Sequence, residues 1–243
     1  NGSEAGTRKF GADAAWRMND QWRLTGELYR QQNLSTDADR DLGEARAEYH
    51  KNAYDLYSGL RVAQDRLGND ETRRSTQLLL GASRRFLDNR LNARISHEQS
   101  LSGSNESVDF PTRTIIGADY KLADPVTLFA EHEITQGESE TSQSSRLGVK
   151  ATPWSGGQLS SSVGREYTES GHRLFANLGL NQTWRINERW SIDGGLDRTQ
   201  TMDRSSAAPF NANVPTAAGA EEDFTSISLG AAYRAEKWSW TGR

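Results

Sequence analysis

The chain has 243 residues, a formal net charge of −4 and a mean hydropathy of −0.81, and only 34% of its residues are apolar. That composition is too polar for a conventional globular core, and the interspersed charges argue against a nucleic-acid-binding surface. Cysteine is absent, which excludes disulfides and thiolate chemistry, and no apolar run approaches the ~20 residues of a transmembrane helix.

Apolar and polar residues alternate along much of the chain, which is the pattern of β-strands with one apolar and one polar face. In the first such segment Phe10, Ala12 and Trp16 share one face, while Asp13 and Arg17 share the other. The alternation predicts about fourteen strands. The clearest lie in 10–18, 22–28, 91–96, 113–122, 174–186, 192–197 and 226–233, and weaker ones lie in 43–51, 144–154 and 158–169.

Short turn sequences recur between these strands at intervals of about 31–36 residues, except for a last interval of about 48. They centre on residues 19–20, 52–53, 88–89, 124–125, 155–157, 187–188 and 236–237. Longer polar segments alternate with the turns: 34–43, 67–74, 102–110, 137–144, 166–172 and 204–221. The repeating unit is therefore a hairpin with a long loop after it. The longest loop, 204–221, either folds inward or stays outside, and the outer position is favoured because loops are usually surface-exposed.

All seven tryptophans lie within a few residues of a short turn. Such a position is typical of the aromatic belt of a membrane-spanning β-barrel. Packing of tryptophan pairs across a hairpin is the alternative, but it does not explain why the long-loop ends carry none. The predicted belt comprises Trp16, Trp22, Tyr54, Tyr120, Trp154, Trp184, Trp190, Tyr233, Trp238 and Trp240. A second belt at the long-loop end would have to use Phe10, Tyr167, Phe175 and Phe224.

With these strands, turns and tryptophans, residues 9–241 resemble the Gram-negative outer-membrane β-barrel proteins. The resemblance implies an all-β, antiparallel up-and-down transmembrane β-barrel, forming a single domain or barrel segment over residues 1–243. It also implies a multi-pass location in the cell outer membrane, with membrane lipid as a partner and small solutes or a passenger domain as further partners. No nucleic-acid partner is expected.

Two features depart from this class. The chain ends Trp240-Thr241-Gly242-Arg243, whereas complete barrels usually end on an aromatic residue. Both ends of the chain also fall at the long-loop end, whereas complete barrels keep both termini on the periplasmic side. We therefore expect these hairpins to belong to a larger barrel of roughly sixteen strands or more.

The polar faces of the predicted strands carry basic and acidic residues in equal numbers. The predicted lumen-lining residues are Asp13, Arg17, Arg23, Glu27, Arg46, Glu48, Asp55, Arg61, Arg94, Arg113, Asp119, Lys121, Glu131, Glu133, Lys150, Arg185, Asp193 and Asp197. They would either filter solutes by charge or form cross-strand ion pairs that stiffen the wall. Ion pairing is favoured, because balanced charge confers no net ion preference.

The sequence predicts no catalytic or metal site and no cofactor. The histidines His50, His97, His132 and His172 lack the spacing of metal ligands, and a GxSxG elbow is absent. The acidic pairs Glu131/Glu133 and Asp193/Asp197 fit a general acid and base, but on alternating strands they fit the lumen better. We therefore expect a non-enzymatic, porin-like pore, or the membrane anchor and translocator of a larger surface protein. An outer-membrane hydrolase and a soluble all-β binding protein are the alternatives.

Overall fold

The computed structural model describes residues 7–33, 39–66, 72–101, 110–137, 141–169, 171–205, 223–234 and 239–242. These residues form fourteen strands and no helix, and so no helix among them is long and apolar enough to cross a membrane. The strands are β1 (Thr7–Arg17), β2 (Trp22–Asn33), β3 (Asp39–Lys51), β4 (Tyr54–Arg66), β5 (Thr72–Phe86), β6 (Leu91–Ser100), β7 (Thr112–Ala123), β8 (Val126–Gln136), β9 (Thr141–Ala151), β10 (Gly157–Thr168), β11 (Gly171–Arg185), β12 (Trp190–Arg204), β13 (Phe224–Arg234) and β14 (Ser239–Gly242).

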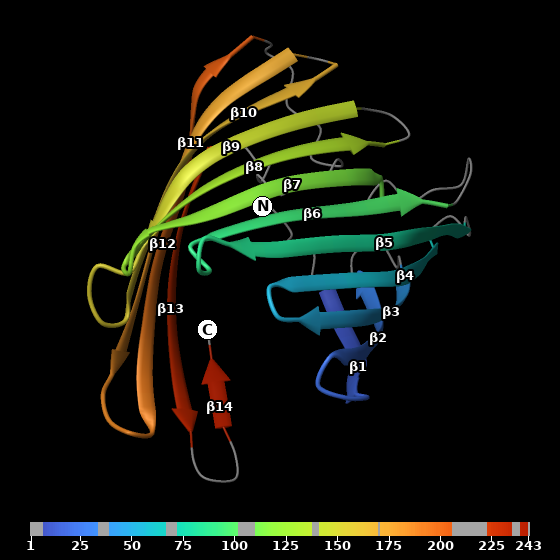
Figure 1. Cartoon of the computed structure of the whole chain (residues 1–243), viewed down its shortest axis with the longest axis horizontal. Helices are drawn as coiled ribbons and strands as arrows, with labels where there is room; N and C mark the ends of the chain where they lie inside the picture. The colour runs from blue at the N-terminus through green and yellow to red at the C-terminus, as the bar shows by residue number, and fades with distance from the viewer. Residues whose placement is uncertain are drawn as a thin grey trace. The chain divides into compact units, whose positions relative to one another are not determined.

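Each strand pairs with its neighbours in the chain, and the order in the sheet runs from β1 to β14 (Figure 1). The predicted all-β, antiparallel up-and-down fold of about fourteen strands is confirmed. β1 to β13 have 10–15 residues each, which is enough for a tilted strand to cross a bilayer. The sheet comprises two compact units, one built mainly on β1–β6 and the other on β9–β14, and β7 and β8 are divided between them.

The hairpins β1–β2 and β11–β12 turn in the same way. The side-chain oxygen of Asn19 accepts a hydrogen bond from the backbone N–H of Trp22 at 2.8 Å, and Asn187 does the same for Trp190 at 2.8 Å. An asparagine that binds the backbone beyond it closes a turn without help from the rest of the fold. Residues 16–22 and 184–190 both read Trp-Arg-x-Asn-acid-x-Trp, so one local sequence specifies both turns.

The likeness of these two hairpins extends into the strand that follows each of them. Trp22 packs on Tyr49 of β3 with a ring-centroid distance of 4.9 Å, and Trp190 packs on Tyr233 of β13 at 4.9 Å. In both cases the two rings are cross-strand partners. Such aromatic pairs fix the register of neighbouring strands. The chain therefore carries an internal repeat of three strands.

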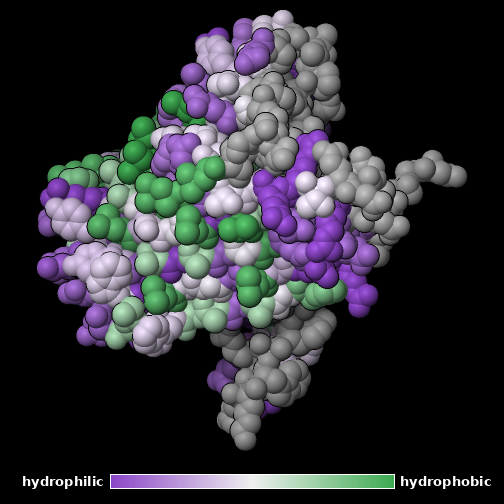
Figure 2. All heavy atoms as spheres, turned by 90° about the vertical axis from the view of Figure 1, so that its right-hand side faces the viewer, coloured by the Kyte–Doolittle hydropathy of each residue, from purple (hydrophilic) through white to green (hydrophobic). Residues whose placement is uncertain are grey.

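The more exposed face of the sheet is apolar and the less exposed face is charged, which is the reverse of the arrangement in a water-soluble protein. On β4, residues 54, 56, 58, 60 and 62 are exposed and mostly apolar, whereas the alternate residues, Asp55 and Arg61 among them, are less exposed. We call these the apolar face and the charged face. Elsewhere on the apolar face Leu28 is 68% exposed and Ile227 is 76% exposed. In Figure 2 hydrophobic residues gather toward the middle of the visible surface and hydrophilic residues toward its sides.

The strand predicted over 158–169 is confirmed as β10, which continues to Thr168, whereas the loop predicted over 166–172 is too long, because β11 already begins at Gly171. Glu166 and Arg173 are cross-strand partners, and both are almost fully buried at 1% and 0% exposure. Their polarity made this stretch look like a solvated loop, whereas it is paired strand with polar side chains on the charged face. Residues 206–221 of the longest predicted loop lie outside the described residues.

Two members of the second aromatic belt are also wrong. Phe175 is fully buried, and it lies between Leu174 and Ala176, so it points to the charged face. Phe224 is the cross-strand partner of Thr199, a buried residue of the same face. The other two predicted members, Phe10 and Tyr167, are 53% and 45% exposed and lie on the apolar face.

Candidate functional site

The register gathers the predicted charged residues of β1–β6 on one face, because cross-strand partners point to the same side of a sheet. Arg17 pairs with Arg23, which pairs with Glu48, and Glu27 pairs with both Asp13 and Glu44. Continuing across β4 to β6 completes the set: Asp13, Arg17, Arg23, Glu27, Arg46, Glu48, Asp55, Arg61 and Arg94.

The remaining predicted residues also share faces with one another. In the second unit Lys150 pairs with Ser160, and from there the register leads through Gly179 to Asp197. Asp193 is the cross-strand partner of Thr183, and Arg185 follows Thr183 by two residues, so Arg185 and Asp193 lie on the same face. On β7, Asp119 and Lys121 follow Arg113 at even spacing, which places all three on one side of that strand. Glu131 and Glu133 share one side of β8 in the same way.

Most of the predicted belt residues at the short turns are exposed, whereas Tyr120 and Tyr233 are half-buried. Of the exposed residues, Trp16 is 61% exposed, Trp154 is 54% exposed and Trp184 is 50% exposed. Trp238 and the side chain of Trp240 fall outside the part of the chain that the structure describes.

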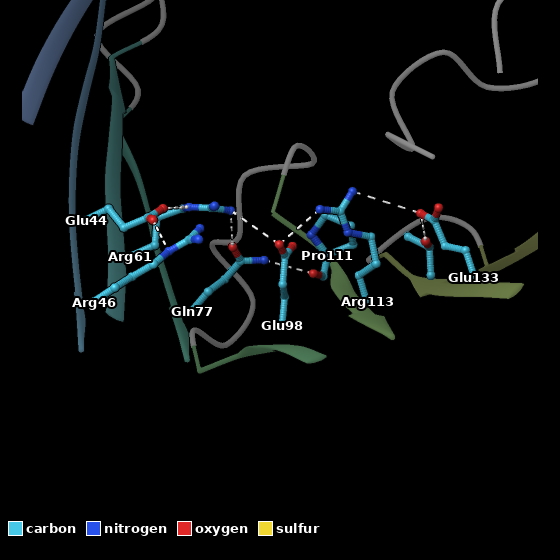
Figure 3. Close-up of polar contacts among 9 residues, drawn as sticks. Glu44, Arg46, Arg61, Gln77, Glu98, Pro111, Arg113 and Glu133 are labelled. Atoms are coloured by element: carbon cyan, nitrogen blue, oxygen red, sulfur yellow. Dashed lines mark hydrogen bonds and ion pairs between the residues drawn. The ribbon is translucent and has the colours of Figure 1, made fainter. Parts of the chain in front are cut away.

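A network of ion pairs and hydrogen bonds crosses the charged face of the first unit from β3 to β8 (Figure 3). Arg61 lies at its centre. Its Nε donates to Glu44 at 2.7 Å, and its Nη1 donates to Gln77 at 3.2 Å and lies 3.9 Å from Glu98. Glu44 also forms an ion pair with Arg46. We call this set, with its continuation to Glu133, the charged-face network.

The network continues from β6 to β8 through Arg113. Its Nη2 donates to Glu98 at 3.0 Å, and its Nη1 lies 4.0 Å from Glu133, which also accepts a hydrogen bond from Thr135 at 3.1 Å. The side chain of Glu133 is only 3% exposed. Arginines and glutamates are equal in number along the network, so it is neutral. Charged groups that are largely withdrawn from solvent need partners, and each arginine of this network lies near a carboxylate.

Phe110 and Pro111, which precede β7, cover part of the charged-face network. The side-chain amide of Gln77 donates to the carbonyl of Pro111 at 2.8 Å, in a buried position. The Phe110 ring is 7% exposed, and the guanidinium carbons of Arg40 and Arg61 lie 5.5 and 5.6 Å from its centroid. It also packs against an apolar cluster on this face, formed by Leu42, Ala63 and Tyr29. Phe110 and Pro111 thus lie over the charged face of β3–β5.

In the second unit, Arg173 and Phe175 form a separate buried cluster. Arg173 is 0% exposed, its Nε donates to Thr201 at 2.8 Å, and its guanidinium lies 5.2 Å from the Phe175 centroid. Asp223 lies just before β13, with its carboxylate 3.6 Å from Arg173. Hydrogen bonds from the side chain and backbone of Thr201, and the positive charge of Arg173 and Arg204, lower the pKa of Asp223.

Phe129 forms a second aromatic centre in this unit. Arg146 donates to Glu131 at 2.9 Å, and its guanidinium lies 5.5 Å from the Phe129 centroid, while the Lys150 ammonium lies 4.8 Å away. The ring fills the space where a side chain at Gly148 would project. Aromatic rings that cover strand glycines in this way stabilise a sheet. Sequence reasoning missed these interior phenylalanines, and it also missed Glu44, Gln77, Glu98 and Arg146.

One cluster brings together the residue types of a serine hydrolase but not their geometry. His50 Nδ1 lies 2.8 Å from Asp55, and the Ser83 hydroxyl donates to the same carboxylate at 3.2 Å, beside a groove of about 370 Å³. A catalytic triad needs the histidine between the serine and the acid, whereas here Asp55 lies between the other two. The described residues also contain no group of three or more metal ligands.

Neither a protein-family model nor a curated protein matches the sequence. The structure is similar to a bacterial polysaccharide outer membrane secretin, with a TM-score of 0.65 and 10% identity, over 95% of this chain and 79% of that one. It is also similar to the ferric yersiniabactin uptake receptor FyuA from Yersinia pestis, with a TM-score of 0.47 and 14% identity, over 97% of this chain and 48% of that one. At 10% identity the first likeness concerns the fold alone, which is a single sheet of antiparallel, up-and-down strands.

Proposed function

We propose that the chain forms a multi-pass β-barrel wall in the outer membrane of a Gram-negative bacterium, with its charged face lining an aqueous conduit. One observation carries the proposal, namely that large apolar side chains are exposed while charged side chains are buried. In water this distribution would be unfavourable, whereas in a bilayer the apolar face contacts lipid.

The dimensions of the apolar face support the membrane location. On β2 the outward residues from Trp22 to Leu28 are Trp, Leu, Gly and Leu, followed by Arg30. At ~3.3 Å per residue this stretch covers about 20 Å along the strand. An outer-membrane barrel has an apolar band of ~25 Å flanked by aromatic and polar residues. The tryptophans would mark the periplasmic edge and the arginines the outer edge.

Transport through the conduit is the favoured role, in keeping with the fold neighbour described as a polysaccharide outer membrane secretin. The second candidate is a membrane anchor or translocator for a larger surface protein. It is favoured by the neutral, internally paired network, which Phe110 and Pro111 partly cover. Neither role requires a cofactor or a catalytic residue.

Single-channel recording distinguishes the two roles. The folded chain in planar bilayers should give discrete conductance steps, and their absence at every voltage would leave the anchor as the remaining role. Because Phe110 lies over the charged face, Phe110→Ala should raise the conductance of each step. Phe86→Ala, which removes an outward ring at the end of β5, is the matched control and should leave the conductance unchanged.

A further inference from the structure

We propose that the apolar face of β1–β4 carries a binding site for one anionic lipid. Arg30 and Arg66 hold the phosphate of its headgroup, and an acyl chain lies in the groove over Gly43. This site depends on the proposed membrane location, since a lipid-facing surface is needed for it to be occupied.

The groove arises because a glycine interrupts a row of larger side chains. Ala12, Leu28, Gly43 and Val62 are successive cross-strand partners on β1–β4. Leu28 is 68% exposed and Val62 is 50% exposed, so they stand as walls on either side of Gly43. The groove measures about 520 Å³, and Phe10 borders it as well. Its apolar walls suit a hydrocarbon chain.

Basic residues occupy the end of this groove nearer the long loops. Arg30 binds the Asp41 carboxylate with two hydrogen bonds of 2.5 and 2.7 Å, and Arg66 lies 3.3 Å from the same carboxylate. The two arginine side chains are 45% and 48% exposed. Two guanidinium groups that share one carboxylate and face outward retain donors for a second anion.

The surrounding register rows add further positive charge. The two rows of cross-strand partners that contain Arg30 and Arg66 also contain two further arginines and two acids. These are Arg8, Arg74, Asp39 and Asp41. Four arginines against two aspartates leave a net charge of +2. Guanidinium groups bind phosphate oxygens in a bidentate manner, and basic residues at a membrane surface attract anionic headgroups. Free phosphate would use these donors but not the groove, whereas a lipid would use both.

The internal repeat supplies a matched control within the same chain. The outward residues of β12 are Trp190, Ile192, Gly194, Leu196 and Arg198, in the same spacing as Trp22 to Arg30 on β2. However, Leu196 pairs with Ile227 where Leu28 pairs with Gly43, and Arg198 pairs with Thr225 where Arg30 pairs with Asp41. Arg198 therefore corresponds to Arg30, but Ile227 occupies the position at which Gly43 leaves a groove.

The test is native mass spectrometry of the full chain in detergent micelles, titrated with phosphatidylglycerol, with phosphatidylcholine of identical acyl chains, or with inorganic phosphate. The wild-type chain should retain phosphatidylglycerol preferentially. R30Q/R66Q should weaken that retention about tenfold, to the level of phosphatidylcholine. R198Q should leave it unchanged. Gly43→Ile should weaken retention of both lipids, because the new side chain fills the groove, but it should leave phosphate binding intact. The fold should tolerate this change, since a side chain at residue 43 meets only the tip of Leu28.

Equal retention of the two lipids by the wild type, or equal weakening by R198Q and R30Q/R66Q, would overturn the lipid site. Unchanged lipid retention in Gly43→Ile would do the same. Each variant is first checked for the wild-type mobility shift on heating, which reports the folded sheet. Insertion of the wild type into liposomes without a lipid preference rejects this site alone, whereas failure to insert rejects the membrane location as well.

Discussion

At the scale of single residues, the charged-face network depends on every arginine having a carboxylate nearby. Glu98 serves both Arg61 and Arg113, and its side chain is 16% exposed. Glu98→Gln should lower the free energy of unfolding by about 1–2 kcal/mol, because it leaves two half-buried guanidinium groups with one carboxylate partner fewer. Urea unfolding in lipid vesicles measures this loss. Glu27→Gln changes an exposed acid of the same face and should cost less than about 0.5 kcal/mol; equal losses would contradict the network.

Asp223 should make the second unit sensitive to acid. Its pKa in the folded chain is lower than the ordinary value of 3.8, so its contribution to stability is present above that value. The contribution is lost as the pH falls through the lowered pKa, when the carboxyl group is protonated and releases Thr201 and Arg173. The thermal midpoint should therefore drop between pH 5 and pH 2 by less in Asp223→Asn than in the wild type. An identical drop in both would show that Asp223 is not the group responsible.

Much of the charged face follows from the sequence, because alternation assigns each residue of a strand to one of two sides. Arg61, Arg113 and Glu133 could be assigned in this way. Their partners could not, since the contact between Arg61 and Gln77 depends on the register of β4 with β5, which a single sequence leaves open. Gln77 also carries no charge, so a search for charged residues passes over it.

At the scale of elements, the two faces of a strand should respond differently to the same substitution. Leu178 is 44% exposed on the apolar face of β11, so Leu178→Arg should cost about 2–4 kcal/mol if that face contacts hydrocarbon. Asn181→Arg places the same charge on the opposite face of the same strand and should be tolerated. The fraction of chain inserted into liposomes measures both effects. Full insertion of Leu178→Arg would count against the assignment of the faces.

Turns proved easier to predict than strand ends. Asn19 and Asn187 close their hairpins through local hydrogen bonds, so the sequence around them is sufficient. The start of β11 was missed because Arg173 is polar although it is buried. Hydropathy cannot distinguish a buried polar pair from a solvated loop, since the distinction depends on what lies in front of the sheet.

At the scale of the whole molecule, the up-and-down fold was predictable because every strand joins its neighbour through a short turn or a loop. The segment of Phe110 and Pro111 was not. Its contact with Gln77 joins residues 34 positions apart, and its position depends on the apolar cluster that Leu42 and Ala63 form on an otherwise polar face.

The position of the tryptophans makes a prediction for the whole molecule in a bilayer. If the short turns lie at one membrane surface, lipids brominated near the headgroup should quench tryptophan fluorescence more strongly than lipids brominated near the bilayer centre. Replacing Trp16, Trp22, Trp184 and Trp190 by phenylalanine should remove most of this difference. Stronger quenching from the bilayer centre would contradict the belt.

The order of the strands also bears on how such a sheet is built. Each strand finds its partner in the segment just made, so no pairing must wait for a distant part of the chain. Every new hairpin pairs with the edge strand that the previous hairpin leaves. At any moment only one edge strand on the growing side therefore exposes backbone groups that could pair with another chain. The Asn-closed hairpins, which turn without outside help, are suited to start such growth, and their repetition in β1–β2 and β11–β12 provides two independent starting points.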